Sequence, residues 1–138
     1  MRTKWPVLVA SAFVLGVACW GMNAAWAVIQ FRNEFVARYV KKDSKEPKDQ
    51  AFAQLVEEAK CNICHEGTDR KKRNAYGDAL DRLLDRTKDA RDKAKIQAAL
   101  AEVESEKVDP KDPKSPTFGD RIKAGELPVP LPPKDEKK

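Results

Sequence analysis

The residue types best suited to chemistry lie together near the middle of the chain, at Cys61-Asn62-Ile63-Cys64-His65. His65 is the only histidine of the protein, and Cys61 and Cys64 are two of its three cysteines. Structural zinc needs four ligands, usually from two separated pairs, so a carboxylate such as Glu66 would have to complete a zinc site here. A dithiol redox centre of the thioredoxin kind needs a strand–helix–strand framework, which this sequence does not indicate. A plain disulfide would close only a very short loop and would restrict little chain entropy.

Covalent haem attachment is the interpretation that also explains the position of the histidine. Haem c is held by thioether bonds from two cysteines to its two vinyl groups, and the residue after the second cysteine lies against the iron. Three residues make about one helical turn, so both sulfurs face one side of the segment. We therefore expect one covalently attached haem c, anchored by Cys61 and Cys64, with His65 as the proximal ligand of the iron.

The N-terminal segment predicts export. Two basic residues in the first four positions precede the apolar stretch WPVLVASAFVLGVACWGMNAAWA, which ends in Ala25-Trp26-Ala27. This order is typical of a secretory signal peptide, with cleavage after Ala27. An uncleaved anchor at 7–29 and a lipid anchor on Cys19 are the alternatives. Export implies an oxidising compartment, so we expect a periplasmic or secreted protein.

The rest of the chain predicts an all-α domain at 28–125, followed by a flexible tail at 126–138 rich in Pro and Lys. Apolar residues recur at helical spacing in each expected helix, and no segment alternates as a strand would. The expected helices are 28–40, a helix capped by Asp49 that runs to Cys61, a helix capped by Asn74, a helix capped by Asp89, and a short helix opened by a capping box of Thr117 with Asp120 and closed by Gly125.

The segments EAKCNICHEG, RNAYGDAL and TFGDRIKAGELP together resemble a group of small exported bacterial single-haem c-type cytochromes. In those proteins an Asn-x-Tyr-Gly segment follows the haem site and a Thr-Phe-Gly-Asp segment comes near the end. The resemblance covers roughly residues 30–128. It implies a small cytochrome c-like helical domain around one haem, and one-electron transfer as the activity. Seven apolar residues are candidates for the wall of the haem pocket: Phe52, Leu55, Tyr76, Leu80, Leu83, Phe118 and Ile122.

The sequence departs from the usual single-haem carrier at the sixth iron position. Such carriers place a methionine there, whereas both methionines of this chain, Met1 and Met22, precede the domain. Tyr76, Asn74, a lysine, the amino group of Val28 or water remain as candidates. Without methionine we expect a lower reduction potential, and an open iron would favour a second function, as a gas or peroxide sensor or weak peroxidase.

The charge pattern says little about partners. The chain carries a formal net charge of +5, and its basic residues are mixed with acidic ones. No aromatic residues interleave with basic ones as in a nucleic-acid interface, so we expect no nucleic-acid binding. We expect an electron carrier rather than an enzyme, with redox proteins as partners, and membrane association only if the N-terminal segment stays uncleaved.

Overall fold

The computed structural model describes residues 23–132, and the side chains from residue 29 onward. The helical elements, in their order along the chain, are α1 (Asn23–Tyr39), α2 (Pro47–Ala59), a 3-10 turn η1 (Lys60–Ile63), α3 (Ala75–Leu83), α4 (Lys93–Val103) and α5 (Phe118–Ala124). The described residues form no strand; two isolated bridges, His65 with Arg73 and Lys107 with Thr117, are the β-type pairings. The all-α prediction is therefore confirmed.

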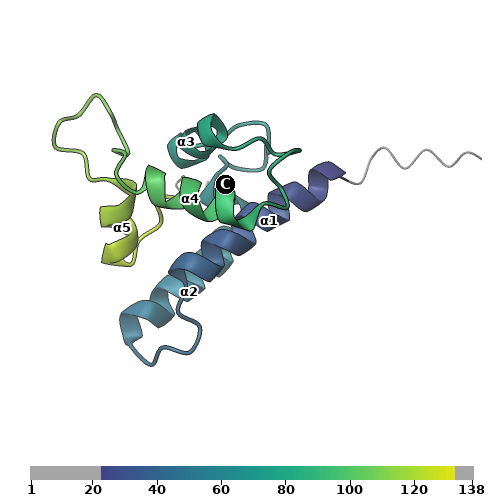
Figure 1. The fold of residues 1–138 in the computed structure, drawn as a ribbon. Coiled ribbons are helices and arrows are strands. Elements are labelled where there is room, and N and C mark those ends of the chain that lie inside the picture. Colours follow the sequence, from purple (N-terminus) through teal and green to yellow (C-terminus); the bar gives the residue numbers. More distant parts are fainter. Residues whose placement is uncertain (1–22, 133–138) are drawn as a thin grey trace, which may run out of the picture.

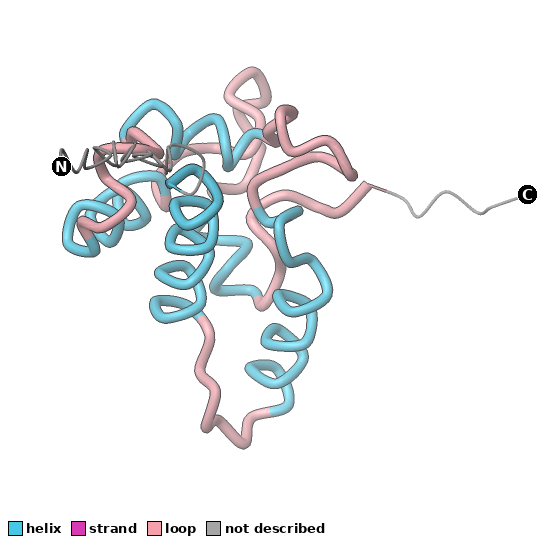
Figure 2. Tube along the Cα trace, turned by 90° about the vertical axis from the view of Figure 1, so that its right-hand side faces the viewer, coloured by secondary structure: helices cyan, strands magenta, loops and turns pink. Residues whose placement is uncertain are grey.

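Contacts between the helices position the turn that carries the two cysteines. α1 packs against α4, α3 packs against α4, and η1 follows α2 and contacts α1. Figure 2 shows α1 and α2 as two arms joined by a loop. An ion pair between Arg32 and Glu57, with 2.8 Å between its nitrogen and oxygen, links the two arms. The turn is thus placed against the body of the domain.

Three aromatic rings from three different helices lie in the core. Phe35 of α1, Tyr76 of α3 and Phe118 of α5 are each at most 1% exposed. The Tyr76 ring meets both others edge-on, with ring centroids 5.9 Å from Phe35 and 5.1 Å from Phe118. Such edge-to-face contacts between buried rings stabilise a core beyond the area that they bury. Tyr76 therefore joins the first and last helices to α3.

The helix starts were predicted in part. Asn74 and Thr117 do cap α3 and α5, and Asp120 completes the capping box at Thr117. Gly125 ends α5 with φ 82°, as expected of a glycine at a helix C-terminus.

Two predicted caps are wrong. Asp49 lies inside the first turn of α2, because Pro47 already occupies the first turn, where its fixed φ suits a helix start. Asp92, not Asp89, caps α4, accepting from the backbone N–H of Lys95.

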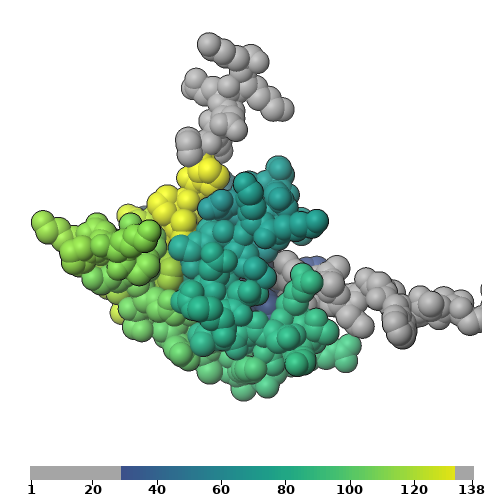
Figure 3. Space-filling model, turned by 90° about the horizontal axis from the view of Figure 1, so that it is seen from above, coloured from purple at the N-terminus to yellow at the C-terminus, as the bar shows by residue number. Residues whose placement is uncertain are grey.

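The end of the domain lies beyond the boundary predicted at residue 125. Leu127 is 3% exposed and Pro128 is fully buried. The Nε of Arg121 donates to the carbonyl oxygen of Leu127 at 2.9 Å, which ties the segment to α5. Figure 3 shows this segment, in yellow, against the teal part of the chain. The first residues of the predicted tail therefore pack on the domain, because their apolar side chains reach the core, while residues 133–138 lie outside the described part.

The predicted signal segment at 1–27 falls largely outside the described residues. Only its last residues, from Asn23, are described, and they belong to α1, which continues through the predicted cleavage position after Ala27. Among residues 23–132, no helix is both long enough and apolar enough to cross a membrane.

Candidate functional site

The Cys61–His65 segment forms a tight turn directly after α2. Lys60 ends α2 with φ 50°, an uncommon conformation for a residue other than glycine, and the chain then enters η1. The backbone N–H groups of Cys64 and His65 both donate to the carbonyl oxygen of Cys61, at 3.2 and 3.1 Å. Both cysteines are free thiols of intermediate exposure. Cys64 packs against the hydrophobic core, so its thiol is the more enclosed part of the residue.

His65 is held from one side by the chain that returns after the turn. Its Nδ1 lies 3.2 Å from the carbonyl oxygen of Lys72. The same oxygen accepts from the backbone N–H of Glu66 at 3.1 Å, which fixes its position. Histidines that bind a metal almost always donate their other ring N–H to such an acceptor, which sets the tautomer and the orientation of the ring. With Nδ1 protonated, Nε2 keeps the lone pair that a metal requires.

Asn74 holds the turn from the other side. Its Nδ2 lies 3.2 Å from the carbonyl oxygen of Asn62 and 3.1 Å from that of Ile63. Its backbone N–H donates to the carbonyl oxygen of Cys64 at 3.0 Å. Three successive carbonyls of the turn are therefore satisfied by one residue, which is itself only 5% exposed.

Gly77 lets the first turn of α3 approach this segment closely. A Cβ built at Gly77 would lie 2.0 Å from the carbonyl oxygen of Cys64. Its backbone N–H donates to Oδ1 of Asn74 at 2.9 Å, which is the helix cap. The Asn-x-Tyr-Gly segment thus has a structural role that sequence reasoning missed. The visible signal was a cap residue followed by a glycine three positions later, but its partner carbonyls could not be read from the sequence.

Burial raises the pKa of the Cys64 thiol to about 12, and the neighbouring Cys61 adds to the effect. At neutral pH Cys64 is therefore a protonated thiol. The described residues form no strand, whereas a dithiol centre of the thioredoxin kind needs a strand–helix–strand framework.

The donor set separates zinc from haem. Within the described residues, no group of three or more His, Cys, Asp or Glu side chains is arranged to hold a metal ion. A zinc site needs such a group. Haem c needs only one imidazole and two thiols from this segment. The residue types of this segment are those that haem c uses: Cys61 and Cys64 would hold it through thioether bonds, and Nε2 of His65 would ligate its iron.

The candidates for the pocket wall and for the sixth position are also placed. Five candidates for the pocket wall belong to the hydrophobic core: Phe52, Tyr76, Leu80, Phe118 and Ile122. The other two, Leu55 and Leu83, are partly buried and pack against it. The side-chain amide of Asn74 is used by the turn and by the cap, so it is not free to act as the sixth ligand. Val28 lies within α1. The hydroxyl of Tyr76 is buried and has no hydrogen-bond partner among the described residues.

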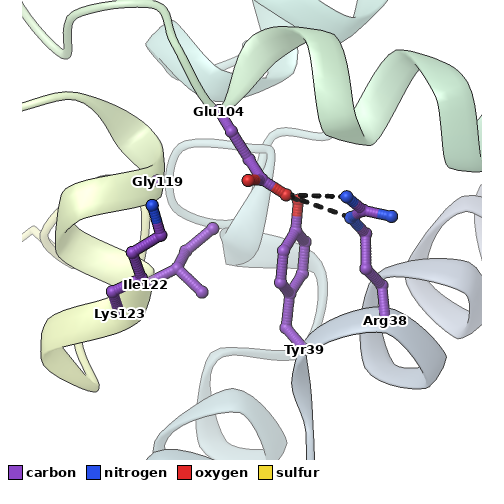
Figure 4. A pocket seen from close by; sticks show the side chains of 6 residues that line it. All are labelled: Arg38, Tyr39, Glu104, Gly119, Ile122 and Lys123. Atoms are coloured by element: carbon purple, nitrogen blue, oxygen red, sulfur yellow. Dashed lines mark hydrogen bonds and ion pairs between the residues drawn. The ribbon is translucent and has the colours of Figure 1, made fainter.

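Two surface pockets lie elsewhere. One, of about 410 Å³, is lined by Arg38, Tyr39, Glu104, Gly119, Ile122 and Lys123 (Figure 4). In it the carboxylate of Glu104 accepts from the Tyr39 hydroxyl at 2.9 Å and from Arg38 at 3.0 Å. The other, of about 700 Å³, is mainly polar and is lined by Arg73, Lys95 and residues 81–89. Neither is lined by Cys61, Cys64 or His65.

Comparison of the chain with protein-family models, with curated proteins and with solved structures gives no match. The interpretation of the site therefore depends on its own residues and geometry.

Proposed function

We propose that this protein is an exported single-haem c-type cytochrome that transfers one electron at a time between redox partners. One observation carries the proposal: Nδ1 of His65, in Cys61-x-x-Cys64-His65, lies 3.2 Å from a backbone carbonyl oxygen. That contact presents Nε2 as the ligating atom, in the arrangement of metal-binding histidines generally.

When bound, haem c would supply an iron that alternates between the ferric and ferrous states, gaining and losing one electron. The chain's own residues do the rest. Cys61 and Cys64 anchor the ring, the carbonyl of Lys72 orients His65, and Asn74 holds the turn that carries all three. Such groups set the reduction potential through the ligand and the hydrogen bonds around it.

A second function, as a sensor of small gases or peroxide or a weak peroxidase, has one observation in its favour. No methionine or histidine follows His65 anywhere in the chain. The usual strong axial ligands are therefore missing after the segment, and the side-chain amide of Asn74 is already used by the turn and by the helix cap. An iron with an open position would bind small ligands, whereas an electron carrier usually has both axial positions filled.

Mass spectrometry of the protein, exported from a host able to attach haem c, tests the proposal. We expect the mass of the chain plus one haem for the wild type, and the mass of the chain alone for the double variant Cys61→Ala with Cys64→Ala. A wild-type product that weighs no more than its amino acids would refute it. N-terminal sequencing of the same product reports whether cleavage follows Ala27.

Optical spectra of the ferrous protein with and without carbon monoxide separate the two functions. A low-spin spectrum that the gas leaves unchanged supports the electron carrier, and rapid, complete binding supports the sensor. Redox proteins in the periplasm or outside the cell are the partners that the carrier requires. Membrane association follows only if the N-terminal segment is retained.

A further inference from the structure

Asn74 makes more hydrogen bonds than its role as a helix cap requires. Every polar group of this residue has a partner. Nδ2 faces the carbonyls of Asn62 and Ile63, Oδ1 accepts from Gly77, the backbone N–H donates to Cys64, and the backbone carbonyl accepts from Asp78. A helix cap alone would use only the contacts with Gly77 and Asp78. The donors to residues 62–64 need a different explanation.

We propose that Asn74 is a positioning residue for the haem site: it sets the conformation of the Cys61–His65 turn before a cofactor is attached. The inference rests on the proposed function and deepens it. In the turn, the carbonyl of Cys61 is satisfied from within, by Cys64 and His65. The three carbonyls that follow receive their donors from Asn74. Asn74 thus fixes the peptide planes that lie between the two thiols and before the imidazole.

The returning chain extends this control to His65. Asn74 lies two residues after Lys72, whose carbonyl faces Nδ1 of His65. Two backbone hydrogen bonds flank the pairing of His65 with Arg73. One runs from the N–H of Asn74 to the carbonyl of Cys64, and the other from the N–H of Glu66 to the carbonyl of Lys72. If the contact of Asn74 with Cys64 loosens, the carbonyl of Lys72 moves relative to the imidazole. Outer groups of this kind tune the ligand that they hold.

Substitution of Asn74 can separate its two roles. Asn74→Asp keeps a good helix cap, because a carboxylate accepts from Gly77 at least as well as an amide does. It also removes the Nδ2 donor and places an acceptor against the carbonyls of Asn62 and Ile63. Asn74→Ser likewise keeps a cap, but its short side chain cannot reach both carbonyls. Thr117→Ala is the matched control, since it removes the cap of α5, far along the chain from the turn.

The experiment compares these full-length variants after export with haem-attachment machinery. Mass spectrometry gives the fraction of chain carrying haem, and optical spectra and potentiometry report on the iron ligand. We expect Asn74→Asp to lower the loaded fraction about tenfold, the lower range seen for loss of an outer-shell partner. The remaining loaded protein should show a shifted ligand-field spectrum and reduction potential. Asn74→Ser should show a smaller change in the same direction, and Thr117→Ala should load fully with an unchanged potential, although its melting temperature falls.

The outcomes distinguish this inference from the proposed function. If the wild type loads haem and Asn74→Asp loads equally well, with the spectrum and potential of Thr117→Ala, Asn74 is only a cap and the inference is wrong. If Asn74→Asp does not fold, Asn74→Ser decides by the same criteria. A wild type without added mass overturns the proposed function itself, and this inference with it.

Discussion

Gly77→Ala is the substitution whose consequence can be worked out most directly from the structure. The added Cβ would lie 2.0 Å from the carbonyl oxygen of Cys64 and 3.0 Å from its carbonyl carbon. Both of these are backbone atoms, so no side chain can turn away to make room. The contact can be relieved only if α3 and the Cys61–His65 turn separate by about 1.4 Å, because ordinary van der Waals contact begins at 3.4 Å.

Separation on this scale breaks the bond from Asn74 N–H to Cys64, now 3.0 Å long. Overpacking of a rigid site costs about 3 kcal/mol, and the lost buried hydrogen bond adds about 1 kcal/mol. The better helix propensity of alanine returns about 1 kcal/mol. We therefore expect the free energy of unfolding to fall by about 3 kcal/mol, or the melting temperature by about 15 °C for a domain of this size.

Thermal and urea denaturation followed by circular dichroism measure the effect, and two other glycines provide controls. Gly67 has a positive φ of 61° and open space around its Cβ position, so Gly67→Ala should lose only about 1 kcal/mol from backbone strain. At Gly119 the Cβ would lie 2.9 Å from the carbonyl oxygen of Glu104, so Gly119→Ala should fall between the other two. If Gly77→Ala is no less stable than Gly67→Ala, the close approach of α3 to the turn is wrong.

Three further predictions concern polar groups in and near the core. Tyr76→Phe should raise the free energy of unfolding by about 1 kcal/mol, because the buried hydroxyl has no partner within the described residues. Tyr39→Phe should instead lower it, since that hydroxyl lies 3.1 Å from the Leu100 carbonyl; chemical denaturation measures both, and a loss of stability in Tyr76→Phe would contradict the first. The hydrogen bond from Lys95 lowers the pKa of Asp89 most, and the hydrogen bond from the backbone of Asp85 lowers it further. The charge of Asp89 therefore stabilises the fold above the ordinary pKa of an aspartate, and this stabilisation is lost as pH falls through the lowered pKa. Asp89→Asn should therefore be less sensitive to acid than the wild type in denaturation curves below about pH 4, and equal acid sensitivity would argue against a role for this pair.

The helices could be predicted from the sequence because a helix is specified by residues within a few positions of one another. The stripe of Phe52, Val56 and Ala59 needs only the helical repeat, and Thr117 with Asp120 needs only a spacing of three residues. The predicted caps at Asp49 and Asp89 are wrong because each has a competitor within three positions. Pro47 starts α2 before Asp49, and Asp92 caps α4 in place of Asp89. The segment after residue 125 was misjudged because its prolines suggested an extended tail, whereas the burial of Leu127 depends on a surface that other helices create.

The site was predictable in its reactive residues but not in their support. Cys61, Cys64 and His65 are adjacent in sequence, and chemistry requires that spacing. The carbonyls of Lys72, Asn62 and Ile63 carry no side-chain signal, so their contacts with His65 and Asn74 follow only from the path of the chain. Contacts with backbone acceptors of this kind cannot be predicted from the sequence and are identified only in the structure.

The Thr-Phe-Gly-Asp segment near the end of the chain packs on the helix that follows the cysteine pair. α5 begins as α3 does, with a capping side chain, a buried aromatic ring and a glycine pressed against a carbonyl. Gly119 donates its N–H to the carbonyl of Glu104 at 2.9 Å, much as Gly77 approaches that of Cys64. The two aromatic rings, Tyr76 and Phe118, meet edge-on with centroids 5.1 Å apart. The start of the last helix therefore packs directly on the start of the helix that holds the turn.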